Sequence, residues 1–232
     1  PNCENKAHAW HRVFFKRQHN CERLMETFAE KFVTIIDENF LCEEEIQEVL
    51  DSIALLEPEY SAPLYAEYPE KCRMLPRGCY TKKYAPEQYR REVKRCRNSM
   101  LEHFGWLYAK MIPEINKYYG KPCKFLPTLN PPGFHVLHGP ISNRDQLEGY
   151  GVGADGGYRF HKDYFSWMEE LEGFEIESWV VVLQVPKFPT GLIFRDDSRF
   201  NYKAGMFARW QGNISHSISD VVCEEGEARI TL

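Results

Sequence analysis

A histidine and an aspartate two residues apart are the feature that most constrains this sequence. His161 and Asp163 stand in Phe160–Asp163, and side chains at i and i+2 of a β-strand point to the same face. His216 lies much later, in the apolar and polar alternation Ile214–Ile218. Two histidines and one carboxylate form a facial ligand set for Fe(II), with the opposite coordination positions open. We therefore predict a sheet that wraps around and brings these segments together.

The last predicted strand, Ala228–Leu232, carries a second polar pair. Arg229 and Thr231 share one face of this strand, while Ile230 and Leu232 share the other. A guanidinium beside a hydroxyl is a good binding site for a carboxylate. We expect the polar face to point inward, toward a charged ligand, and the apolar face to point toward covering helices.

Further strand candidates are Phe134–His138, which precedes His161, and Trp179–Val185, Thr190–Phe194 and Gly205–Trp210, which lie between Asp163 and His216. From about residue 130 to residue 232, the order of His161-x-Asp163, these strands, His216 and Arg229-x-Thr231 resembles the Fe(II)/2-oxoglutarate-dependent oxygenases. The gap from His216 to Arg229 is longer than is usual in that family, and the acidic turn Cys223–Glu227 looks like the insertion responsible.

The resemblance implies an α+β fold: a distorted double-stranded β-helix, jelly-roll and cupin-like, with a covering layer of N-terminal helices. His161, Asp163 and His216 would hold Fe(II) and act as the catalytic centre. Arg229, helped by Thr231, would bind the distal carboxylate of the co-substrate 2-oxoglutarate. With O2, such a centre oxidises an unactivated C–H bond, most often by hydroxylation, and releases succinate and CO2.

Composition and charge narrow the choice of substrate and partner. The net charge of −5 argues against nucleic acid as the main partner. Because the sequence has no run of membrane-spanning length and no secretion signal, we expect a cytoplasmic protein without membrane contact, a monomer or homodimer. The predicted substrate is a small molecule, such as an amino acid or a related metabolite. Arg159 shares a strand face with His161 and is either a substrate contact or part of a surface ion pair. Weaker candidate substrate contacts are Trp179, Arg195, Arg209 and Trp210.

Several alternatives remain open. A protein or peptide hydroxylase would use the same iron chemistry, and a non-catalytic β-helix module would bind metal or ligand without turnover. A cupin-type site normally requires His-x-His and a glutamate, from which His161-x-Asp163 departs. Halogenases carry Gly or Ala in place of the carboxylate that Asp163 supplies here. We interpret His135 and His138 as structural residues.

We expect a single domain over residues 1–232, with 1–126 a mainly helical scaffold and 127–232 the β-helix core. Apolar spacing predicts helices over Glu22–Phe40, over Glu43–Leu56 and from Pro86 to about Ile112. We expect Pro58 to stop the second helix and Pro113 to kink or end the third. Residues 58–84 and 144–158 are predicted loops and candidate lids over a pocket. The eight cysteines include no CxxC pair, and we expect reduced thiols.

Overall fold

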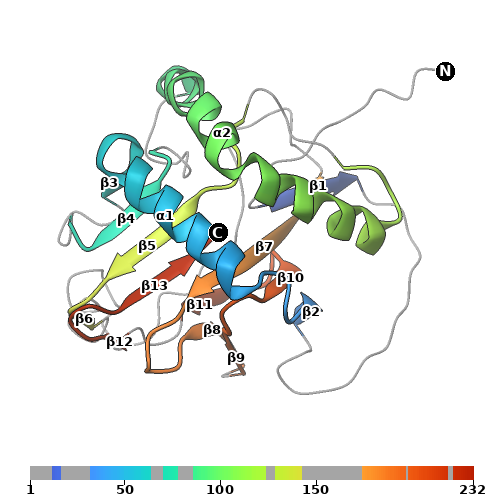
Figure 1. The fold of residues 1–232 in the computed structure, drawn as a ribbon. Coiled ribbons are helices and arrows are strands. Elements are labelled where there is room, and N and C mark those ends of the chain that lie inside the picture. Colours follow the sequence, from blue (N-terminus) through green and yellow to red (C-terminus); the bar gives the residue numbers. More distant parts are fainter. Residues whose placement is uncertain are drawn as a thin grey trace.

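The computed structural model describes residues 12–16, 32–63, 70–77, 86–123, 129–142, 174–196, 198–218 and 222–232. These residues form a mostly antiparallel β-structure with two helices (Figure 1). The largest sheet has eight strands. Its order is β2 (Val33–Asp37), β10 (Phe207–Gln211), β7 (Phe174–Gln184), β13 (Ala228–Thr231), β5 (Phe134–His138), β4 (Cys72–Leu75) and β3 (Ala62–Pro63), with β1 (Arg12–Lys16) also paired to β7.

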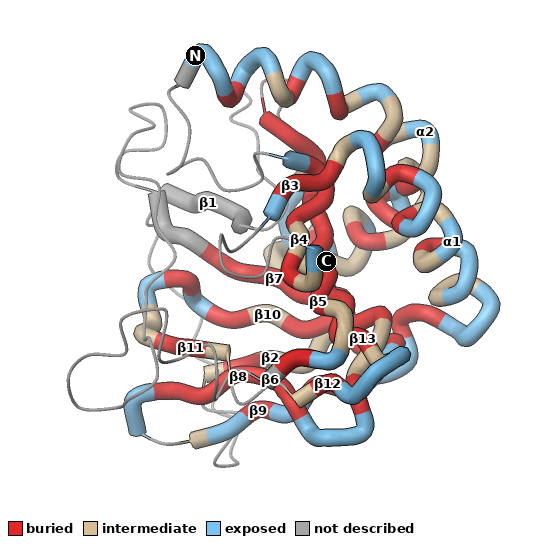
Figure 2. The backbone as a smooth tube through the Cα atoms, turned by 90° about the vertical axis from the view of Figure 1, so that its left-hand side faces the viewer, coloured by how far each residue is buried: buried red, intermediate tan, exposed pale blue. Residues whose placement is uncertain are grey.

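Smaller sheets face one side of the large sheet. One has the order β11 (His216–Ile218), β8 (Gly191–Phe194) and β9 (Arg199–Asn201), and the other pairs β12 (Val222–Cys223) with β6 (Ile141–Ser142). Figure 2 shows that burial is concentrated in the strands. Apolar side chains from the two larger sheets pack together in what we call the inter-sheet layer: Val33, Val180, Val182, Leu192, Phe194, Phe200, Tyr202, Met206, Ala208 and Trp210. The arrangement is a jelly-roll-like β-sandwich.

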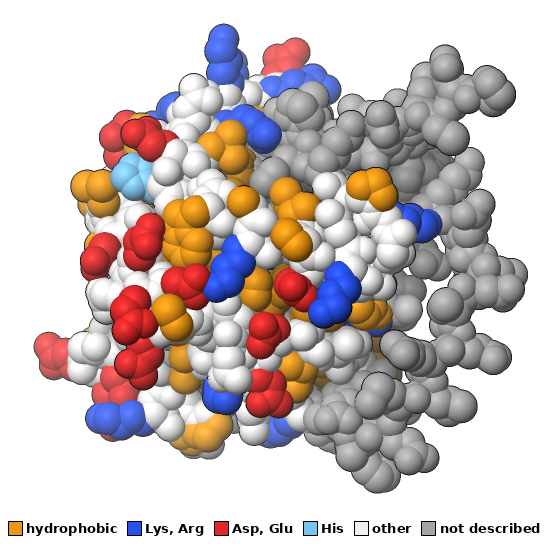
Figure 3. Space-filling model, turned by 45° about the vertical axis from the view of Figure 1, so that its right-hand side comes forward, with side chains coloured by type: hydrophobic (Ala, Val, Ile, Leu, Met, Phe, Trp, Pro, Cys, Tyr) orange, Lys and Arg blue, Asp and Glu red, His pale blue; other side chains and the backbone are white. Residues whose placement is uncertain are grey.

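Two amphipathic helices cover the other side of the large sheet (Figure 1). Val49 and Ile53 of α1 (Glu43–Tyr60) and Met100 and Phe104 of α2 (Pro86–Tyr119) share one core with Val181 and other strand residues. Neither helix of the described chain is long and apolar enough to cross a membrane. Figure 3 shows acidic and basic side chains interspersed on one face of the molecule. Of the predicted covering layer of N-terminal helices, the two that correspond to α1 and α2 are confirmed.

The strands predicted in the second half of the chain are also confirmed, except for Phe160–Asp163, which lies outside the described residues. β5, β7, β8, β10, β11 and β13 coincide with the predicted segments to within a few residues, except that β7 begins earlier, at Phe174. Cys42, Cys96, Cys123 and Cys223 are free thiols. Burial raises the pKa of the Cys223 thiol to about 11.

The helix predicted over Glu22–Phe40 is wrong where the structure describes it. Val33–Asp37 forms β2, which pairs with β10. Val33 and Ile35 face the inter-sheet layer, whereas Ile36 packs toward the helices. The run Val-Thr-Ile-Ile is rich in β-branched residues, which favour strands, and this local preference outweighs the helical spacing of the apolar residues.

The predicted loop at 58–84 needs two corrections. Pro58 does not end α1, which continues to Tyr60, and the strands β3 and β4 occupy Ala62–Pro63 and Cys72–Leu75. β4 is only four residues long and is followed by Pro76, so its alternation was too short to outweigh the loop-like composition. Of the first candidate lid only residues 64–69 and 78–84 lie outside the described part, whereas the second, residues 144–158, lies outside it entirely. α2 runs through Pro113 to Tyr119, and Gly120 follows it with φ of 61°.

An ion pair between α1 and α2 should make the free energy of unfolding depend on pH in the acidic range. Lys110 Nζ donates to Glu45 Oε2 at 2.7 Å, and the backbone N–H of Cys42, at the start of α1, donates to the same oxygen at 2.9 Å. The hydrogen bond from Lys110 lowers the pKa of Glu45 below its ordinary value of 4.5. A lowered folded-state pKa contributes stability above the unfolded-state value, and this stability is lost as pH falls through the folded-state value.

We therefore expect Glu45→Gln to lower the free energy of unfolding at neutral pH by about 0.5 kcal/mol, as for other partly exposed pairs. The difference from the parent protein should shrink to nothing below the folded-state pKa. Urea unfolding over a pH series measures it, with the exposed Glu48→Gln on the same helix as the control. A difference that grows as pH falls would contradict this assignment.

Candidate functional site

Strand β13 places Arg229 inside the sandwich. It lies between β5 and β7 in the large sheet, with Arg229 opposite Leu137 and Thr231 opposite both His135 and Val182. Its alternate residues Ala228 and Ile230 belong to the core shared with the helices. The polar residues therefore point to the other side, and the predicted orientation of this strand is confirmed.

The guanidinium of Arg229 is buried without a counter-charge in the described part of the chain. Arg229 is 2% exposed, and its Nε and Nη1 have no hydrogen-bond acceptor among the described residues. Burying a cation is costly unless an anion and hydrogen-bond acceptors accompany it. The chemistry of the position therefore fits an anionic ligand. Thr231 is 3% exposed and shares this strand face, but its predicted contact with the ligand remains a prediction.

Tyr202 is a site residue that sequence reasoning missed. Its ring centroid lies 5.2 Å from the guanidinium carbon of Arg229, within the range of a cation–π contact. Such a contact fixes the position of the guanidinium through a ring and uses none of its N–H donors. The alternation of Phe200 and Tyr202 at the end of β9 was the signal that could have indicated an inward-facing aromatic residue.

The second element of the site is His216, at the start of β11. It is 3% exposed, and its Nδ1 lies 2.8 Å from the carbonyl oxygen of Ile214. Because a carbonyl only accepts hydrogen bonds, Nδ1 carries the proton in the neutral imidazole and Nε2 carries the lone pair. Metal-binding histidines commonly have this second hydrogen bond, which fixes the tautomer and orients the ring.

His216 and Arg229 lie on the same side of the large sheet. The imidazole contacts Trp210 and Phe194, at centroid distances of 5.4 and 6.4 Å, and both of these aromatic residues belong to the inter-sheet layer. Arg229 contacts the same layer through Tyr202. Two of the predicted site residues, far apart in sequence, therefore adjoin one set of buried side chains.

The rest of the predicted metal site lies outside the described residues. This applies to His161 and Asp163, and also to Arg159. Within the ranges that the structure describes, no three His, Cys, Asp or Glu side chains are grouped closely enough to hold a metal. The triad therefore stays a prediction, supported on the described side by the tautomer and burial of His216.

The alternation of residues along β7 and β10 shows which of the weaker candidate substrate contacts face the same side of the sheet as Arg229. Trp179 lies on the helix-facing side of β7, where it packs against Tyr118 and Tyr119, so it does not share a site with Arg229. Arg209 is ion-paired with Glu177, which lies two residues before Trp179 on β7, and it also contacts Tyr118. Neither residue is brought to the inter-sheet layer, whereas Trp210 is.

Arg195 follows β8, the central strand of the three-stranded sheet. It is exposed, and its Nε donates a hydrogen bond to Ser215 Oγ at 3.0 Å, one residue before His216. A contact with substrate remains a prediction for this residue.

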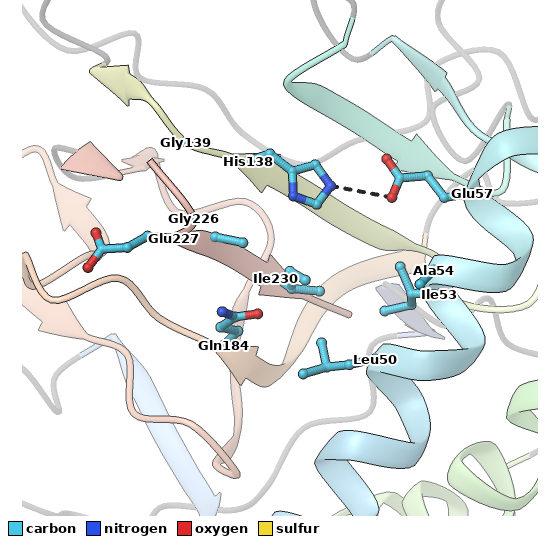
Figure 4. A pocket seen from close by; sticks show the side chains of 11 residues that line it. Leu50, Ile53, Ala54, Glu57, His138, Gly139, Gln184, Gly226, Glu227 and Ile230 are labelled. Atoms are coloured by element: carbon cyan, nitrogen blue, oxygen red, sulfur yellow. Dashed lines mark hydrogen bonds and ion pairs between the residues drawn. The ribbon is translucent and has the colours of Figure 1, made fainter. Parts of the chain in front are cut away.

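A separate hollow of about 270 Å³ lies on the helix-facing side of the sheet (Figure 4). Leu50 and Ile53 of α1 line it together with Ile230, on the side of β13 opposite to Arg229. At its rim, His138 Nε2 lies 3.4 Å from Glu57 Oε2, and Arg73 Nε lies 3.2 Å from the other carboxylate oxygen. These contacts link α1 to β4 and β5, in agreement with a structural role for His138.

Comparisons with known proteins do not identify the chain. No protein-family model matches it, and no curated protein does. Among solved structures, a prolyl-4-hydroxylase from Pseudomonas putida is similar over 87% of this chain and 90% of that chain, at 11% sequence identity and a TM-score of 0.41. A likeness of this extent does not determine an activity.

Proposed function

We propose that this protein is an Fe(II)/2-oxoglutarate-dependent oxygenase that hydroxylates an unactivated C–H bond of a small molecule, such as an amino acid or a related metabolite. Succinate and CO2 are the co-products. The observation that carries the proposal is the buried guanidinium of Arg229, which has two nitrogens without an acceptor among the described residues. The double-stranded β-helix is the finer description of the sandwich that this function implies.

The chemistry around Arg229 favours a carboxylate as the ligand. One guanidinium balances one negative charge, and Thr231 on the same strand face adds a hydroxyl donor. Because both side chains are nearly inaccessible to solvent, the pairing occurs away from water, where a charge-assisted hydrogen bond is strong. Arg229 thereby orients the co-substrate from its distal end.

His216, with His161 and Asp163, would hold the iron at the other end of the co-substrate. Bound iron, together with 2-oxoglutarate and O2, supplies the oxidising power. The chain's own task is to fix the ligand's position and to exclude water. The carbonyl of Ile214 contributes by keeping the proton on Nδ1 of His216 and the lone pair on Nε2.

Anaerobic titration with Fe(II) and 2-oxoglutarate tests the proposal. We expect a weak visible charge-transfer band, because the metal and the 2-oxo acid chelate at one centre. His216→Ala and Asp163→Ala should lose the band. His138→Ala should keep it, since this partly exposed imidazole lies on the helix-facing side of the sheet.

A folded protein that gives no band would overturn the oxygenase assignment and leave a non-catalytic binding module. If the band forms, succinate release on addition of amino acids and other small metabolites identifies the substrate class. Failure of all of these, with a gain of one oxygen atom in a captured protein, would instead indicate a peptide hydroxylase.

A further inference from the structure

The inter-sheet layer contains another buried donor beside His216. Trp210 of β10 is 7% exposed, and its indole Nε1 has no hydrogen-bond acceptor among the described residues. Its ring meets the imidazole of His216 at an interplanar angle of 74° and a centroid distance of 5.4 Å. A buried tryptophan N–H usually finds a hydrogen-bond partner.

Burial of an unpaired indole N–H does not by itself point to a ligand. The Nε1 of Trp179, on the opposite face of the sheet, is also buried and also lacks an acceptor among the described residues. Trp210 differs in its surroundings, because it contacts a candidate metal ligand and shares its layer with Tyr202, which contacts Arg229. The polar atoms of Arg229 and Trp210 that lack an acceptor among the described residues are all donors, so a ligand that pairs with them must present acceptors.

We propose that Trp210 is a ligand-positioning residue whose indole N–H donates a hydrogen bond to a carboxylate oxygen beside His216. This inference rests on the proposed function and extends it. A dicarboxylate would be recognised at both ends: Arg229 binds the distal carboxylate, and Trp210 binds the one next to the metal-binding histidine. Hydrogen bonds to charged acceptors are stronger than neutral ones, so this donor should contribute measurably to affinity.

Trp210→Phe separates this role from simple packing. Phenylalanine keeps an aromatic ring in the layer and removes the N–H. Calorimetric titration of 2-oxoglutarate in the presence of Mn(II), which avoids turnover, should show affinity about tenfold weaker than in the parent protein. The melting temperature of the ligand-free protein should change little, because removing a buried donor that lacks an acceptor among the described residues offsets the cavity left by the smaller ring. Trp179→Phe is the matched control and should leave the affinity unchanged.

The outcomes distinguish this inference from the proposed function. If the parent protein with Mn(II) does not bind 2-oxoglutarate, both fail. If the parent protein binds it and Trp210→Phe binds it equally well, Trp210 only packs against His216, and the inference is overturned while the proposed function stands.

A second readout needs no variant. The chain has five tryptophans, so a protein labelled with ¹⁵N-tryptophan gives few indole signals. With diamagnetic Zn(II) in place of iron, addition of 2-oxoglutarate should move one indole N–H signal downfield, as a new hydrogen bond requires. Unchanged indole signals under saturating 2-oxoglutarate would overturn the inference.

Discussion

Arg229→Met is expected to abolish 2-oxoglutarate binding and, at the same time, to stabilise the ligand-free protein. The guanidinium is 2% exposed and has two nitrogens without an acceptor in the described chain. Removing one partner of a buried charge pair typically costs about 3–5 kcal/mol, so affinity should fall at least about 100-fold. Without ligand, an apolar side chain of similar length removes a charge-burial penalty, and we expect a gain of about 1–2 kcal/mol in the free energy of unfolding.

Two measurements check this prediction. Calorimetric titration with 2-oxoglutarate and Mn(II) gives the affinity, and urea unfolding without ligand gives the stability. Arg229→Lys is an informative companion, because it keeps the charge and loses the planar fork that matches a carboxylate. A methionine variant that loses stability while still binding 2-oxoglutarate would assign Arg229 to the structural core.

Arg209 is also largely buried, but its replacement by methionine should lower the free energy of unfolding instead of raising it. Its Nη1 is hydrogen-bonded to Glu177 Oε2, and the side chains of the pair are 16% and 8% exposed. Burial alone would lower the pKa of Arg209, but the adjacent Glu177 carboxylate raises it above its ordinary value. Arg209→Met removes the guanidinium from this carboxylate, and we expect a loss of about 3 kcal/mol in stability.

A double-mutant cycle separates the pair from its surroundings. Glu177→Leu alone should also destabilise the protein, whereas Arg209→Met combined with Glu177→Leu should recover most of the loss, since apolar residues often replace a buried pair without net cost. Urea unfolding at neutral pH measures all four proteins. Additive losses in the double variant would show that the two side chains stabilise the fold independently. Affinity for 2-oxoglutarate should be retained by Arg209→Met, which makes it a control for Arg229→Met.

Much of the sandwich could be predicted because its strands alternate clearly. Ala228–Leu232 places every second residue on an apolar face, and that face packs on the helices as expected. The same alternation predicted that Arg229 points inward before any contact was known. The local sequence was sufficient to predict the orientation of this strand, because a strand with one apolar face pairs in the register that buries that face.

Other features depended on partners distant in sequence. Val33–Asp37 has both helical apolar spacing and β-branched residues, and its pairing with β10 decided between them. Arg209 and Trp210 are neighbours, so only the faces of β10 could show that Trp210 alone enters the inter-sheet layer. The contact between Tyr202, which follows β9, and Arg229 of β13 joins segments distant in sequence, so neither local pattern could predict it.

The position of β13 within the sheet has a consequence for how the site selects its ligand. Arg229 projects from a strand that is hydrogen-bonded to β5 on one edge and to β7 on the other. A backbone held on both sides cannot shift to meet a shorter or longer acid, and the Tyr202 ring limits the swing of the side chain. If Arg229 binds a dicarboxylate as proposed, its fixed position should make the affinity depend on the number of carbon atoms between the two acidic groups of the ligand.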